Sequence, residues 1–86
     1  MLENSSEKRI ALLGIIVSDG AAVESVNAVL HDFGAAIVGR MGLPLRDRGI
    51  NAISVVLDAE VNTVNALTGK LGAIRGVTAK ALFQKV

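Results

Sequence analysis

One segment of this chain occurs twice, 38 positions apart. Ala21–Val29 is echoed by Ala59–Leu67, and Phe33-Gly34-Ala35 is echoed by Leu71-Gly72-Ala73. A solenoid needs more copies than two, because each unit buries its apolar face only against its neighbours. Two copies within 86 residues therefore predict one domain built from two similar halves.

The composition limits the classes of function. The chain has no cysteine, which excludes disulfides, thiolate catalysis and iron–sulfur ligation. Its net charge of +1 gives no general attraction to nucleic acid or to an anionic membrane. Hydrophobic residues make up 51% of the chain, which is more than so small a core should need. We therefore expect part of the apolar surface to be buried against another subunit.

The polar residues 1–8 are expected to form a flexible N-terminus, and residues 9–86 a single domain. The apolar run from Ile10 to Val17 is too short to span a bilayer, and acidic residues before it argue against a signal peptide. We interpret it as a buried first strand and expect a cytoplasmic protein without membrane contact.

Each half has a strand, a helix and a second strand. In the first half we expect a strand over 10–17, a turn at Ser18-Asp19-Gly20, a helix over 22–33 that Asp19 caps and Gly34 stops, and a strand over 36–43. A polar turn over 44–49 leads to a strand over 50–57, a helix that ends at Gly72 and a strand over 77–83. Gly69 inside the second helix predicts a short or irregular helix.

The order β-α-β-β-α-β is that of an α+β ferredoxin-like sandwich, with a four-stranded antiparallel sheet and both helices on one face. The opposite face should be open. Yet the first and third strands carry apolar residues on both of their sides, as the neighbours Leu12 and Leu13 and the neighbours Val55 and Val56 show. An apolar open face predicts a homo-oligomer, a dimer or tetramer, joined through that face or through a sheet edge.

The sequence offers two candidate binding sites, one in the first strand–helix turn and one at the hairpin. Asp19 and Gly20 open the first helix, where free backbone N–H groups favour an anion and glycine admits a ligand close to the backbone; simple helix capping is the alternative. Arg40, Arg46 and Arg48 gather around the hairpin and could contact an anion or a partner, or be an ordinary solvated turn balanced by Asp47.

Other chemistries lack their residues. His31 is the only histidine and has no partner at a ligand-like spacing, so we interpret it as a surface residue and expect no metal site. The chain has no Trp or Tyr, and its two phenylalanines, Phe33 and Phe83, lie where core residues are expected, so we expect no RNA base stacking on the sheet. Without a recognition helix we also expect no direct DNA binding. No nucleophile–base pair is evident, so we expect neither an enzyme nor a cofactor.

Three segments carry a family resemblance: Ile37–Pro44, Ile53–Ala59 and Ala66–Val77. They are similar to small bacterial iron-only hydrogenase system regulators, over about Arg9 to Lys80, and Leu67–Val77 is the most specific part. The resemblance implies an ACT-like ferredoxin fold, related to the C-terminal domain of the nickel-responsive repressor, in a homo-oligomeric regulatory module of anaerobic metabolism. Unlike that repressor, this chain is expected to have no separate DNA-binding domain beside this fold, and these 86 residues contain no cysteine.

Amino-acid-binding ACT domains use a glycine in the first strand–helix loop, and Asp19-Gly20 occupies the matching position. The sequence thus predicts a regulatory homo-oligomer that binds a small ligand at a subunit interface. The alternative is a structural module that docks a hydrogenase-related partner without a ligand. The ligand, the partner, the subunit count and whether regulation acts on transcription stay open.

Overall fold

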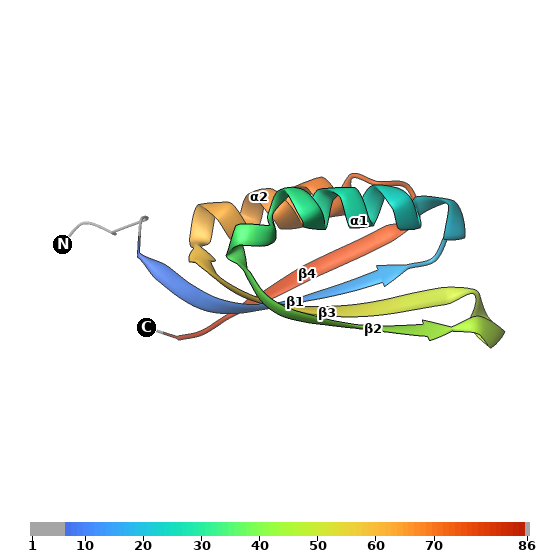
Figure 1. Ribbon diagram of the computed structural model, residues 1–86, viewed down its shortest axis with the longest axis horizontal. Coiled ribbons are helices and arrows are strands. Elements are labelled where there is room, and N and C mark those ends of the chain that lie inside the picture. Colours follow the sequence, from blue (N-terminus) through green and yellow to red (C-terminus); the bar gives the residue numbers. More distant parts are fainter. Residues whose placement is uncertain (1–6, 86) are drawn as a thin grey trace.

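The elements follow the predicted order. The computed structural model describes residues 7–85, and residues 1–6 and 86 lie outside the described part. In chain order the strands and helices are β1 (Lys8–Val17), α1 (Val23–Asp32), β2 (Ile37–Leu45), β3 (Ile50–Glu60), α2 (Val61–Gly72) and β4 (Val77–Phe83). The strands form one antiparallel sheet in the order β2-β3-β1-β4. Both helices lie on the same face of this sheet (Figure 1), which is the ferredoxin-like α+β arrangement.

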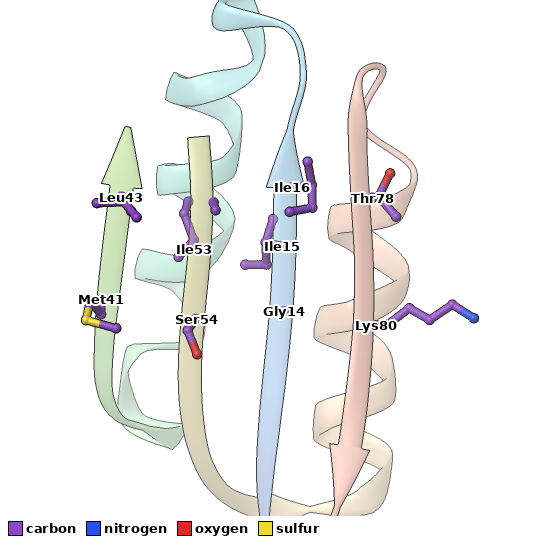
Figure 2. A pocket seen from close by; sticks show the side chains of 10 residues that line it. Gly14, Ile15, Ile16, Met41, Leu43, Ile53, Ser54, Thr78 and Lys80 are labelled. Atoms are coloured by element: carbon purple, nitrogen blue, oxygen red, sulfur yellow. The ribbon is translucent and has the colours of Figure 1, made fainter. Parts of the chain in front are cut away.

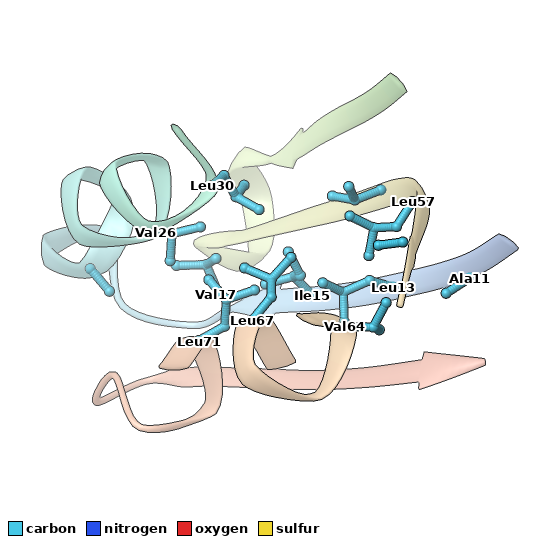
Figure 3. Close-up of a cluster of buried hydrophobic side chains, with 13 residues drawn as sticks. Ala11, Leu13, Ile15, Val17, Val26, Leu30, Leu57, Val64, Leu67 and Leu71 are labelled. Carbon is cyan, nitrogen blue, oxygen red and sulfur yellow. The ribbon is translucent and has the colours of Figure 1, made fainter. Parts of the chain in front are cut away.

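The core lies between that sheet face and the two helices (Figure 3). Along β1, alternate residues such as Leu13 and Ile15 are fully buried, because successive strand residues point to opposite faces. In α2, Val64, Leu67 and Leu71 share one face at helical spacing and are completely inaccessible to solvent. Among residues 7–85, the thirteen buried core residues are Ala11, Leu13, Ile15, Val17, Ala22, Val26, Leu30, Val55, Leu57, Ala59, Val64, Leu67 and Leu71.

Several predicted boundaries were wrong. β1 begins at Lys8, so this residue belongs to the sheet, while residues 1–6 of the predicted flexible segment lie outside the described residues. Gly34 does follow α1, but it does not adopt the left-handed conformation of a C′ glycine; it begins a short 3-10 helix over Gly34–Ala36. Gly69 does not interrupt α2, which runs continuously through all twelve of its residues.

The two halves differ most between their first strand and helix. In the first half, a turn and a 3-10 helix (Gly20–Ala22) separate β1 from α1. In the second half, β3 extends to Glu60 and α2 begins at the next residue, so the predicted end of this strand at residue 57 was wrong. The internal repeat therefore gives two similar βαβ units, of which only the first has room for a loop site.

Candidate functional site

The sheet face opposite the helices is open and apolar. The residues of β1 that alternate with the core, Leu12 and Ile16, are 44% and 41% exposed. In an antiparallel sheet, paired residues point to the same face, so the strand registers extend this surface across all four strands. Its large apolar side chains are Ile10, Leu12, Ile16, Met41, Leu43, Leu45, Val56 and Leu82. We call this surface the open face.

An apolar groove of about 420 Å³ lies at the centre of the open face (Figure 2). Its floor is formed by small residues, Gly14 on β1 and Ala52 and Ser54 on β3. Larger side chains, among them Ile16 and Leu43, rise beside it. The groove is therefore a gap between ridges of a sheet surface, and its lining offers an apolar contact rather than a set of catalytic groups.

Asp19 caps the chain where the first helical turn begins. Its Oδ1 accepts a hydrogen bond from the Ala21 backbone N–H at 3.0 Å, and its carbonyl accepts one from Ala22 N–H at 2.9 Å. The predicted capping role is thus present, although the helix that Asp19 caps is the 3-10 helix that precedes α1. Gly20 is open: a Cβ added there would meet no atom within 4 Å.

A second loop holds this turn in place. The Ser18 N–H donates to the Gly76 carbonyl oxygen at 2.7 Å, so the loop before β4 is tied to the end of β1. Gly76 has a φ of +82°, and a Cβ built on it would lie 2.6 Å from the Asp19 Cβ. Only glycine fits this backbone conformation and this close approach.

Gly20 lies beside the β2–β3 hairpin, which sequence reasoning did not foresee. A hollow of about 270 Å³ is lined by Gly20 from the first turn and by Pro44, Leu45, Arg46, Gly49, Ile50 and Asn51 from the hairpin. It combines a guanidinium, a carboxamide and an open backbone, which are groups that can hold a small anionic or zwitterionic molecule. No periodicity in the sequence links Gly20 to Asn51, because the contact depends on how the hairpin bends.

The three predicted arginines do not act as one cluster. Arg40 pairs with Val55, which places it on the helix side of β2, and its Nη2 donates to Asn27 Oδ1 on α1 at 3.1 Å. Arg46 and Arg48 lie at the hairpin tip in a 3-10 helix and are exposed. Of the three, only Arg46 lines the hollow next to Gly20.

His31 is exposed on α1. Within residues 7–85, no three histidine, cysteine, aspartate or glutamate side chains come together in a way that could hold a metal ion. Over the same residues, no helix is long and apolar enough to cross a membrane.

Comparison with known proteins gives a family. The family model TM1266-like, described as "Iron-only hydrogenase system regulator, putative", matches residues 9–81. The chain belongs to the TM1266-like family. The structure of the protein TM1266 from Thermotoga maritima is 41% identical in sequence, with a TM-score of 0.88 over 92% of this chain and 100% of that one. No curated protein matches the chain.

More distant structures share the fold alone. The C-terminal domain of the MgtC protein from Mycobacterium tuberculosis is 14% identical, with a TM-score of 0.71 over 96% of this chain and 94% of that domain. A formyltetrahydrofolate deformylase from Pseudomonas putida KT2440 is 13% identical, with a TM-score of 0.62 over 85% of this chain and 28% of that enzyme. The TM1266-like sequence resemblance is thus specific, while the ferredoxin-like fold is widely used.

Proposed function

We propose that this TM1266-like protein is a non-enzymatic regulator that works as a homo-oligomer joined through its open face, and that a small ligand in the hollow beside Gly20 tunes the assembly. The family description supports the regulatory role. The observation that carries the assembly is the exposure of eight large apolar side chains on one sheet face.

The area of this surface suits a subunit interface. The eight residues are between 36% and 71% exposed. At about 200 Å² for a fully exposed residue of this size, they present ~800 Å², which is near the ~800 Å² that each partner buries in a standard interface. The largest apolar patch on a typical monomer is smaller, about 300–600 Å². Covering the open face with a second copy removes this surface from water.

One edge of the sheet, formed by β2, is poorly suited to assembly. This strand carries a register shift between Ile37 and Gly39 and a proline at Pro44. Bulges and edge prolines disrupt the ladder of hydrogen bonds that an added strand would need. The open face is therefore better suited to assembly than the β2 edge.

The position of the hollow supports a link between ligand binding and assembly. Leu45 on β2 pairs with Ile50 on β3, and both residues belong to the set that points to the open face. Both also line the hollow. A ligand held by Arg46, Asn51 and the Gly20 backbone would thus sit at the end of the open face. Binding there would favour whichever assembly offers it more contacts, which is regulation by population shift.

The assembly is tested by light scattering after size exclusion, at protein concentrations from about 1 to 100 µM. We expect a monodisperse oligomer, and we expect Leu12→Glu to be monomeric because it places a charge within the apolar face. Ala28→Glu, on the exposed side of α1, is the matched control and should assemble normally. A wild-type protein that is monomeric throughout, or soluble only with a partner, contradicts the proposal and favours the docking alternative.

The ligand is tested by thermal shift with amino acids and small carboxylates. Gly20→Val adds bulk where the folded chain has free space, so the variant should fold but lose any stabilisation by ligand. Arg46→Gln should weaken the response to anionic compounds, while Arg48→Gln, outside the residues that line the hollow, serves as its control. If no compound stabilises the protein, the ligand part of the proposal is wrong while the assembly part stands.

A further inference from the structure

The open face has a stepped relief that follows from the strand registers. Ser54 on β3 pairs with Gly14 on β1, and together they form a low row across the two central strands, here called the trough. Two residues further along, Val56 pairs with Leu12, and Leu12 pairs with Leu82. These three apolar side chains form a high row, here called the ridge. The two rows are about 7 Å apart, since each residue advances a strand by about 3.4 Å.

We propose that a second copy packs on the open face about a two-fold axis that runs across the strands between trough and ridge, so that the ridge of each copy fills the trough of the other. This rests on the proposed function and specifies its contact. A two-fold axis midway between two adjacent rows exchanges them, and isologous interfaces bring one patch against itself in this way. Leu12 of one copy then faces Gly14 of the other, and Val56 faces Ser54.

Packing density favours this register over its simplest rival. If trough faced trough, the small residues would leave a void at the centre of the interface while the ridges collided beside it. Interfaces reach the packing density of protein interiors only when protruding and recessed rows interlock. The approximate area of the open face is sufficient for a stable dimer only if most of it makes such contact.

Lys80, a charged residue that lines the groove, does not oppose this packing. Lys80 stands at the end of the trough row on the edge strand β4, where it pairs with Gly14. Its side chain extends away from the sheet beyond the β4 edge (Figure 2). The ammonium group can therefore stay in water while the aliphatic part covers the rim of the interface.

The decisive variant is Gly14→Leu, because it separates shape from hydrophobicity. A Cβ at Gly14 would meet no atom within 4 Å, so the subunit should keep its fold, which far-ultraviolet circular dichroism checks. In the interlocked dimer the added side chain competes with Leu12 of the partner at two symmetric places. We expect the dissociation constant, measured by analytical ultracentrifugation, to rise at least about tenfold.

The compensating variant tests the pairing itself. Gly14→Leu combined with Leu12→Ala moves bulk from ridge to trough, so it should associate more tightly than Gly14→Leu alone. Gly14→Ala, which adds one methyl group, should give a smaller weakening and carries the test if the leucine variant does not fold.

The outcomes are distinct. If wild type is an oligomer and Gly14→Leu leaves its association unchanged or strengthens it, the register is wrong. The register is also wrong if adding Leu12→Ala to Gly14→Leu does not restore association. In both cases the open face is a less specific apolar interface. If wild type does not self-associate at all, the proposed function fails first.

Discussion

Replacing Gly76 by alanine is expected to destabilise the fold by about 3 kcal/mol. The backbone at Gly76 has a φ of +82°, and this left-handed region costs an alanine roughly 1–2 kcal/mol. The new Cβ would also lie 2.6 Å from the Asp19 Cβ, so one of the two loops must shift, at an overpacking cost of about 1–3 kcal/mol. The lower entropy of the unfolded alanine chain offsets about 0.4–1 kcal/mol of this total.

Gly49 provides a matched control. It also has positive φ, +65°, but a Cβ there meets no atom within 4 Å. Gly49→Ala should therefore cost only about 1 kcal/mol, the conformational part alone. The difference of about 2 kcal/mol between the two variants measures the contact between Gly76 and Asp19.

The assay is urea unfolding followed by circular dichroism at 222 nm, since the chain has no Trp or Tyr for fluorescence. All variants are compared at one protein concentration, because assembly would couple to stability. Asp19→Gly removes the clashing Cβ, so adding it to Gly76→Ala should recover about 1–3 kcal/mol in a double-mutant cycle. Equal destabilisation by Gly76→Ala and Gly49→Ala, or a coupling near zero, would refute the reasoning.

Three further predictions concern the core, the cap and the helix–sheet contact. Leu71→Ala should lower the unfolding free energy by about 2–5 kcal/mol, because this side chain is fully buried; Val38→Ala, at a position 67% exposed, should change it by less than about 0.5 kcal/mol in the same urea titration. Asp19→Ala should cost about 1 kcal/mol through the lost bond to Ala21, and Asp19→Asn, which keeps an acceptor, should cost clearly less; equal losses would show that the bond is not the cause. Arg40→Gln should cost less than about 1 kcal/mol in thermal unfolding, because its bond to Asn27 is exposed to water, and a larger loss would mean that Arg40 has a further role.

The periodicity of apolar residues carried most of the fold prediction. The spacing of Val64, Leu67 and Leu71 identifies the buried face of α2, because side-chain direction repeats every 3.6 residues in a helix. The apolar run of β1 predicts a buried strand but not which of its two sides faces the core, because apolar residues occupy both sides; the structure shows that alternate residues are buried. The boundaries were less predictable. β3 runs on to Glu60 because its pairing with β1 continues to Lys8, a partner that lies far away in the sequence.

The candidate sites were only partly accessible to sequence reasoning. Asp19 and Gly20 could be recognised from local turn chemistry, and the structure confirms that Asp19 caps the turn. The grouping of Arg40 with Arg46 and Arg48 was wrong as a single surface, since β2 directs Arg40 toward α1 while the other two lie at the hairpin tip. Proximity along the chain does not fix the face to which a strand residue points unless its register is known.

The sequence by itself determined the two βαβ halves, their combination in a ferredoxin-like sheet and the existence of an apolar face without a helix over it, because these depend on local periodicity and on the repeat. Only the tertiary structure decided where that apolar surface is high and where it is low, since the trough of Gly14 and Ser54 arises from a cross-strand register. It also decided that Gly20 and Arg46 line one hollow and that Gly76, which lies against Asp19, must be glycine. These are contacts between residues distant in the chain, and the packing of whole elements, rather than any local preference, brings them together.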